Sequence, residues 1–206
     1  MKGRGMNKNI QRTSIAGVMM ATALFFGSVD ALALPRAEIN RSIQPKRAAS
    51  HLTTVRETIP PFAFAKFCAN QSDQCDVRGG QAPISMTKER RLLLQSINAQ
   101  VNRDIRYTDD PSDKDLWRAG VSAGDCDDYA LTKRQRLLDV GWPSSALRVA
   151  TARTEEGVGH AVLVVSTVEG DFVLDNRTNV MKPWYAARLQ WIKIQSQDDP
   201  RKWLTF

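Results

Sequence analysis

Hydrophobic residues recur with helical spacing in two segments of the chain. After Thr87, apolar residues follow at intervals of about three and four up to about Arg103, which predicts a helix capped by the Thr87 side chain. A second helix is expected from Asp125 or Cys126 to just before Gly141, because a glycine commonly follows the last residue of a helix.

Three runs rich in valine, leucine and phenylalanine follow the second helix and predict β-strands. They span residues 147–152, 160–168 and 172 to 174 or 175. Consecutive strands after consecutive helices indicate an α+β fold with an antiparallel sheet, because a doubly wound parallel sheet needs strands and helices that alternate.

The N-terminal segment has the pattern of a secretory signal peptide. A basic stretch ends at Arg12, an uncharged segment follows over residues 13–29, and an Ala-x-Ala cleavage pattern closes it at residues 31–33. A membrane anchor is the alternative, but the apolar centre at residues 15–26 is shorter than the ~20 residues that a span needs. We therefore expect residues 1–33 to be a signal peptide and the mature protein to be periplasmic or secreted.

Residues 34–58 have no sustained hydrophobic periodicity and contain Pro35 and Pro45. This pattern predicts a flexible lead-in, and His51 within it is expected to be a solvated side chain. The folded domain is then expected over residues 59–206.

Composition and charge exclude several classes of protein. An apolar fraction of 42% suits one globular domain and excludes a disordered, collagenous or polytopic membrane protein. The net charge of +7 arises partly in the first 33 residues. Because the chain shows neither a zinc pattern nor an aromatic and basic stripe, we expect no nucleic-acid partner.

The chain has three cysteines, an odd number for an exported protein. Cys68 and Cys75 flank a segment of turn-forming residues, which favours a disulfide between them; two buried free thiols are the alternative. Cys126 is the cysteine left over.

Cys126 is placed at the predicted start of the second helix, where unpaired backbone N–H groups and the helix dipole favour a thiolate. The neighbouring Asp125, Asp127 and Asp128 should raise the pKa of this thiol, unless they face elsewhere or hold a cation. A nucleophilic role for Cys126 therefore requires a basic partner.

His160 is the candidate partner. The other of the two histidines in the chain, His51, lies in the predicted lead-in. A histidine that begins an apolar strand is often structural. However, both turn registers that we consider for the next hairpin place Asp175 on the same sheet face as His160, opposite Val164 or opposite Val162. We favour the second register, which makes His160 and Asp175 diagonal neighbours.

A thiol at a helix end, an imidazole and a carboxylate form a Cys-His-Asp constellation suited to covalent acyl transfer. The segments Phe67-Cys68 to Cys75, NRDIRY from Asn102, GDCDDYA, GHAVLVV and VLDNRT occur in the order typical of one family. The chain resembles the bacterial transglutaminase-like cysteine proteinases, which include the LapG-type periplasmic proteases that release large adhesins from the cell surface.

This resemblance implies a papain-like or transglutaminase-like fold, with the nucleophile helix packed on an antiparallel sheet. It also implies that Cys126 is the nucleophile, His160 the general base and acid, and Asp175 the orienting carboxylate. LapG-type members depend on calcium, which would map a Ca2+ site to Asp125, Asp127 and Asp128, although the chemistry itself needs no cofactor. The alternative is that Asp125 caps the helix and the other two are ordinary first-turn acids.

The oxyanion of an acyl-transfer reaction needs hydrogen-bond donors. The backbone N–H of Cys126 is one candidate, and the indole N–H of Trp117 is a second, with an anchoring role in the core as its alternative. The sequence thus predicts a thiol endopeptidase acting on a protein substrate, such as a surface adhesin, and possible control by an inner-membrane receptor as in LapG-type members. A transglutaminase or amide-transfer enzyme and a non-catalytic binding module on the same fold are the alternatives.

Overall fold

The computed structural model describes residues 50–206, so the predicted signal peptide and residues 34–49 of the predicted lead-in lie outside the described residues. Within residues 50–206, no helix has the length and apolarity that a bilayer crossing requires. The helices of this part of the chain are α1 (Phe62–Asn70), α2 (Lys88–Asp104) and α3 (Cys126–Asp139), with short 3₁₀ helices η1 (Ser72–Cys75), η2 (Ser144–Ala146) and η3 (Trp184–Ala186).

A seven-stranded antiparallel sheet forms the centre of the described domain, with the strand order β1-β9-β8-β4-β5-β6-β7. A separate parallel pair, β2 with β3, lies just before α3. The strands are β1 (Arg56–Thr58), β2 (Arg106–Tyr107), β3 (Ala123–Gly124), β4 (Leu147–Arg153), β5 (Gly159–Thr167), β6 (Gly170–Leu174), β7 (Lys182–Pro183), β8 (Gln190–Gln195) and β9 (Trp203–Thr205).

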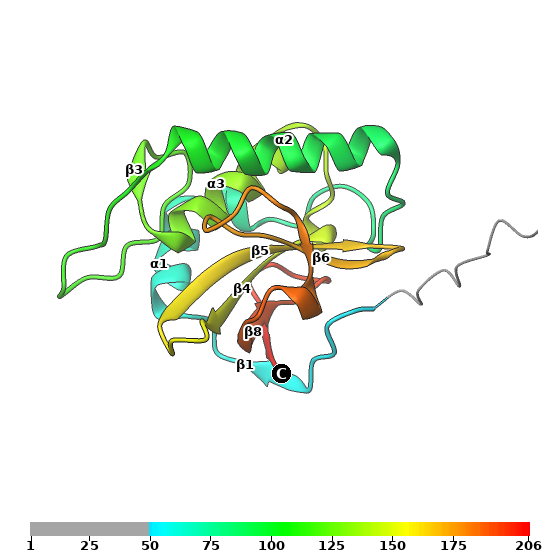
Figure 1. Ribbon diagram of the computed structural model, residues 1–206. Coiled ribbons are helices and arrows are strands. Elements are labelled where there is room, and N and C mark those ends of the chain that lie inside the picture. Colours follow the sequence, from blue (N-terminus) through cyan, green and yellow to red (C-terminus); the bar gives the residue numbers. More distant parts are fainter. Residues whose placement is uncertain (1–49) are drawn as a thin grey trace, which may run out of the picture. The chain divides into compact units, whose positions relative to one another are not determined.

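Alternate side chains of the central strands fill two separate cores. On one face, Val149, Leu163 and Val165 pack in a buried cluster with residues of the helices, including Leu94 and Leu137. This alternation is that of a sheet buried on both faces. The opposite face has a smaller buried cluster, composed of Leu52, Ala150, Val162, Val164, Val173, Ala187 and Ile194. Figure 1 shows α3 between α2 and the sheet, so the helix that begins with Cys126 is held on both sides.

A disulfide joins α1 to η1, and aromatic packing holds α1 against the rest of the domain. Cys68 and Cys75 form the predicted disulfide, with Cα atoms 5.7 Å apart. Phe64 of α1 packs edge-on against Trp117 and Trp203, with ring centroids 5.9 and 5.1 Å away. Trp117, which lines the cleft described below, is thus supported from behind by α1 and β9.

The helices, the three strands and the α+β class predicted from the sequence are confirmed. The Thr87 side chain caps α2 by accepting a hydrogen bond from the backbone N–H of Arg90 at 3.2 Å. In the hairpin of β5 and β6, Leu163 pairs with Leu174 and Thr167 with Gly170. Continuing that register places Asp175 opposite Val162, which is the register that the sequence analysis favours.

The sequence prediction extends a flexible lead-in to residue 58, whereas the structure joins residues 50–58 to the domain. β1 pairs with β9 at the edge of the sheet. Asp171 accepts hydrogen bonds from the backbone N–H of Leu52 at 2.9 Å and from the ring of His51 at 3.1 Å, and it forms a buried ion pair with Arg148. His51 is therefore a contact of the sheet and not a freely solvated side chain. Periodicity does not reveal this segment, because its partners lie more than a hundred residues away.

Candidate active site

The chain turns into α3 at Gly124, and the structure explains why a glycine is needed there. A Cβ atom at this position would lie 1.9 Å from Oδ2 of Asp128 and 2.7 Å from its Cβ. The Asp128 carboxylate is buried beside Gly124 because it accepts hydrogen bonds from the backbone N–H and the guanidinium of Arg118, at 2.7 and 2.8 Å. The Gly124 position therefore allows Asp128 to fasten the first turn of α3 to the preceding loop.

Cys126 is the first residue of α3 and lines an open cleft of about 430 Å3. Its Sγ accepts a hydrogen bond from the backbone N–H of Ala161 at 3.3 Å, so the sulfur lies beside the start of β5. Burial, and next the charge of Asp127, raise the pKa of the Cys126 thiol to about 12, although the Ala161 N–H acts in the opposite direction. The sulfur thus needs a base to become a nucleophile at neutral pH.

His160 follows the first residue of β5 and lies next in the chain to Ala161, whose N–H contacts the sulfur. The His160 side chain is 6% exposed, and its Nε2 lies 3.0 Å from Oδ1 of Asp175, just beyond the end of β6. Since Nε2 is engaged by the carboxylate, Nδ1 is the ring nitrogen that Asp175 leaves available for another proton transfer. The structure thus joins His160 to Asp175 and places Cys126 and His160 in the lining of one cleft.

Asp175 is held by groups that the sequence analysis does not assign. Arg177 directs its guanidinium and its backbone N–H at the carboxylate, with distances from 2.8 to 3.2 Å. Asn102 of α2 donates to the backbone carbonyl of Asp175 at 3.1 Å. Burial alone would raise the pKa of Asp175, but the hydrogen bonds from His160 and Arg177 outweigh it and hold this pKa well below its ordinary value. Asp175 therefore stays ionised beside the imidazole.

The only sign of these supports in the sequence is their place in the segments NRDIRY and VLDNRT, which carry the family resemblance. Arginine and asparagine are common on protein surfaces, so neither residue type indicates a role without coordinates.

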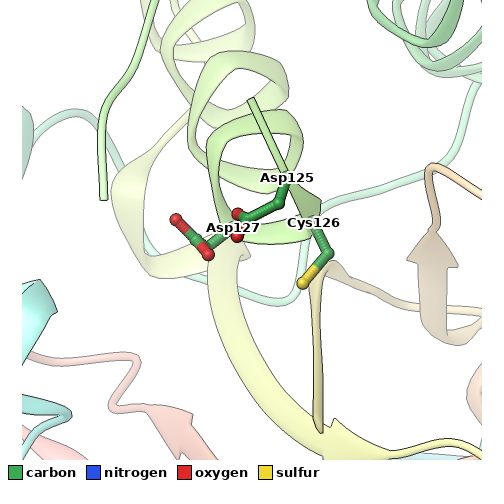
Figure 2. A group of neighbouring side chains, drawn as sticks. All are labelled: Asp125, Cys126 and Asp127. Carbon is green, nitrogen blue, oxygen red and sulfur yellow. The ribbon is translucent and has the colours of Figure 1, made fainter. Parts of the chain in front are cut away.

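Asp125 and Asp127 lie at the edge of the cleft and fit a cation site. Their carboxylates and the Cys126 sulfur offer ligand atoms within 4.8 Å of one another. Figure 2 shows the two carboxylates side by side, while the Cys126 side chain leaves the helix in another direction. One buried oxygen of each, Oδ1 of Asp125 and Oδ2 of Asp127, has no hydrogen-bond partner. Two carboxylates with unpartnered oxygens are ligands that a hard divalent cation prefers.

The electrostatics of this pair favour a nearby positive charge. Burial, with the hydrogen bond and charge of Asp125, raises the pKa of Asp127 far above its ordinary value. Asp125 occupies the N-cap position of α3, yet its side chain makes no capping hydrogen bond. The alternative role for Asp125, as an ordinary helix cap, is therefore not the one that the structure displays.

Asp128, the third carboxylate predicted to bind calcium, differs from the other two. Both of its oxygens accept hydrogen bonds from Arg118, and it is not part of the ligand cluster of Asp125 and Asp127. The first-turn position of Asp128 directs its side chain back toward the preceding loop, where Arg118 is its partner. The sequence could not separate the three acids, because they differ only in the direction in which the helix points them.

Trp117 lines the same cleft as Cys126, with an exposed fraction of 8%. Its side chain hydrogen-bonds the Asp115 carboxyl, which partly offsets the rise that burial causes in the pKa of Asp115. This contact competes with the predicted role of the indole as an oxyanion donor. The backbone N–H of Cys126, at the start of the helix, is the donor that needs no rearrangement.

The site combines a single free thiol, an imidazole fixed by an anionic carboxylate, and an open cleft beside the sulfur. Such a set suits nucleophilic attack on an acyl carbon, with the histidine carrying the proton. A buried carboxylate that is already stabilised as an anion orients the ring and stabilises the imidazolium rather than taking its proton.

Comparisons with known proteins agree with this chemistry. The model of a family described as bacterial transglutaminase-like cysteine proteinase BTLCP matches residues 54–206. The structure of calcium-bound LapG from Legionella pneumophila is 25% identical with a TM-score of 0.50, and the match covers 55% of this chain and 68% of LapG. Two further LapG structures, one of them EGTA-treated, are 28% identical with TM-scores of 0.46, over 50% of this chain and 62% of LapG. Among curated proteins, none matches significantly.

Proposed function

Since the chain belongs to the bacterial transglutaminase-like cysteine proteinases and is a cysteine peptidase, we propose that it is a thiol endopeptidase whose nucleophile is Cys126. The observation that carries this proposal is the hydrogen bond of 3.0 Å between His160 and Asp175 beside the only free cysteine of the chain. The fold and the family are those of an enzyme, and the cleft leaves the sulfur open to a peptide.

In the first step, His160 takes the thiol proton on Nδ1 while Sγ of Cys126 attacks the carbonyl carbon of the scissile peptide bond. Asp175 holds the ring by Nε2 and stabilises the imidazolium that forms. The carbonyl oxygen becomes an oxyanion, for which the backbone N–H of Cys126 is the donor.

The tetrahedral intermediate collapses when the C–N bond breaks and His160 returns its proton to the leaving amine. One product carries a new N-terminus, and the other stays bound to Cys126 as a thioester. His160 then takes a proton from a water molecule, whose oxygen attacks the thioester carbon. The C–S bond breaks, His160 returns the proton to the sulfur, and the second product leaves as a carboxylic acid that ionises in water. The neutral thiol and the neutral imidazole are restored, so protons and bonds balance over the cycle.

We propose Asp125 and Asp127 as ligands of a calcium ion, supported by their unpartnered oxygens and by the calcium-bound state of the similar LapG structure. A bound divalent cation would supply positive charge beside the nucleophile and offset the repulsion that keeps Cys126 protonated. The chain's part is to hold the two carboxylates at the N-cap and in the first turn of α3, pointing in a different direction from the sulfur.

Export to the periplasm or the medium is also part of the proposal. It is supported by the signal-peptide pattern of residues 1–33 and by the Cys68–Cys75 disulfide, which suits an oxidising compartment. A protein substrate follows from the family. A surface adhesin as that substrate and an inner-membrane receptor as a regulator stay predictions from the family resemblance.

New N-termini in envelope and medium proteins test the proposal. Cells that produce the wild type, Cys126→Ala or His51→Ala are compared by labelling and sequencing protein N-termini. We expect a set of N-termini that is present with the wild type and with the His51→Ala control and absent with Cys126→Ala. Attachment of an added primary amine to proteins, without new N-termini, would contradict hydrolysis and indicate amine transfer instead.

A further inference from the structure

The guanidinium of Arg177 binds the carboxylate of the proposed catalytic Asp175, and its contacts include Oδ2, the oxygen that does not face His160. We propose that Arg177 is a positioning residue of this site: it fixes the orientation of Asp175 so that one carboxylate oxygen faces the imidazole. This inference rests on the proposed function, because it assigns Arg177 a task within the same Cys-His-Asp arrangement.

Arg177 contacts both oxygens of Asp175, whereas His160 contacts one of them. Oδ1 faces Nε2 of His160 at 3.0 Å and also accepts from the backbone N–H of Arg177 at 2.9 Å and from its Nε at 3.2 Å. Oδ2 accepts from Nε and Nη2 of Arg177, at 3.1 and 2.8 Å. Among the hydrogen bonds of the described residues, Arg177 is the only partner of Oδ2. Its side chain thus holds Oδ2 in place while Oδ1 faces the histidine.

Removal of the Arg177 side chain should change the carboxylate while leaving the main chain in place. The backbone carbonyl of Asp175 is held by Asn102, and the carbonyl of Thr178 is held by both Asn98 and Asn102 of α2. The Asp175 side chain is 6% exposed, so an Oδ2 without Arg177 would be a largely buried oxygen without a donor. The Asp175 carboxylate would then rotate toward other hydrogen-bond donors, and the imidazole of His160 would lose its fixed acceptor.

Arg177 is reached from a different cavity than Cys126. Asp175 and Arg177 line a cavity of about 210 Å3, whereas Cys126 and His160 line the larger cleft. The Arg177 side chain is 40% exposed. Truncation to alanine would therefore leave a space open to solvent, into which a small planar cation can diffuse without passing the sulfur. The other charged residues that line this cavity are Glu155, Glu156, Lys182 and Arg188.

Charged groups from several elements act on Asp175, and the test must separate Arg177 from them. His160 contributes from β5, and Lys133 of α3 interacts with Asp175 through its charge. Arg188 lines the same cavity as Arg177 but forms its ion pair with Glu155 at 3.7 Å. Arg188→Ala is therefore the matched control, since it removes a guanidinium from the same cavity without removing a donor to Asp175.

The test measures the rate at which iodoacetamide alkylates Cys126 in the full chain, followed by mass spectrometry without reductant. Cys68 and Cys75 are in the disulfide, so Cys126 is the one cysteine that reacts. We expect Arg177→Ala to slow alkylation on the order of 10- to 100-fold, as for a misplaced catalytic group, and Arg188→Ala to leave it unchanged. Arg177→Lys keeps the positive charge but loses the planar guanidinium that binds the carboxylate through two nitrogens. Its alkylation rate should therefore lie between those of wild type and Arg177→Ala.

Chemical rescue distinguishes positioning from a merely structural role. Guanidinium chloride at non-denaturing concentrations, against sodium chloride at equal ionic strength, should restore a large part of the rate in Arg177→Ala and none in Asp175→Asn. A rate in folded Arg177→Ala equal to that of wild type would overturn the inference, as would a slow rate that guanidinium leaves unchanged. If Arg177→Ala does not fold, Arg177→Lys decides in its place: a wild-type rate overturns the inference.

The same measurement separates this inference from the proposed function. If wild type reacts no faster than His160→Ala, the proposed function fails and the role of Arg177 fails with it. If wild type reacts fast, His160→Ala slowly and Arg177→Ala as fast as wild type, only the role of Arg177 is rejected.

Discussion

Gly124→Ala is a change of one methyl group that should damage both the stability and the reactivity of the protein. The added Cβ would lie 1.9 Å from Oδ2, 2.6 Å from Cγ and 2.7 Å from Cβ of Asp128. Because even the Cβ of Asp128 is in the way, rotation of its carboxylate cannot remove the clash. Either the first turn of α3 shifts or the Asp128 side chain leaves its place beside Arg118.

The magnitude follows from the contacts that would be lost. Asp128 accepts two hydrogen bonds from Arg118, and bonds to charged groups contribute about 1.5–3 kcal/mol each. The Arg118 side chain is 42% exposed, so solvent screens the pair and the lower value applies. Two bonds at about 1.5 kcal/mol, less the ~0.4–1 kcal/mol that an alanine gains over glycine through the unfolded state, leave a loss of about 2 kcal/mol or more.

Thermal unfolding of Gly124→Ala and of a Gly80→Ala control provides the assay. A loss of about 2 kcal/mol lowers Tm by about 4–8 °C in a domain of this size. Gly80→Ala should melt at the wild-type Tm or slightly above it, because no atom lies within 4 Å of its added Cβ and alanine restricts the unfolded chain. Alkylation of Cys126 should also slow in Gly124→Ala, since the sulfur is carried by the displaced turn. A Tm within 1 °C of the control would refute the packing argument for Gly124.

Three further predictions concern the disulfide, the cation site and a buried lysine. Replacing Cys68 and Cys75 by serine opens a loop with a sequence separation of 7 and should cost about 2–3 kcal/mol, seen as a lower Tm than the oxidised wild type; an unchanged Tm would contradict it. Calcium chloride at about 100 times its Kd should stabilise wild type by about 2.7 kcal/mol in thermal unfolding, and Asp127→Asn should abolish the response; a wild type indifferent to calcium and chelator would reject the site. Burial lowers the pKa of Lys133 to about 7, and its Nζ has no hydrogen-bond partner. The unfolded chain therefore binds more protons between about pH 7 and 10.5, so stability should rise with pH across that range. Lys133→Met should raise Tm at pH 7 and flatten this rise, and a lower Tm would contradict the reasoning.

The sequence predicts those parts of the fold that local patterns determine. Thr87 and the spacing behind it predict α2, and alternating apolar residues predict β4 to β6, including the register that brings Asp175 to His160. The edge of the sheet was not predictable in this way. β1 pairs with β9, so Arg56 meets Thr205, and nothing near either residue in the chain indicates the other.

The sequence likewise predicts some residues of the candidate site and not others. Cys126, His160 and Asp175 stand out because their residue types, their order and the expected helix and strands suit one chemistry. The roles of Arg177 and Arg118 depend on the directions of side chains after folding, which no spacing rule gives. For the same reason the sequence predicts Asp128 as a ligand together with Asp125 and Asp127, although both of its oxygens accept hydrogen bonds from Arg118.

The central claim is that Cys126, His160 and Asp175 work as one unit, and the alkylation rate of Cys126 near pH 7 tests it most directly. We expect iodoacetamide to react with wild type far faster than with an ordinary exposed thiol. His160→Ala and Asp175→Asn should both react much more slowly while melting as cooperatively as wild type. Equal rates in wild type and His160→Ala, with both proteins folded, would contradict it.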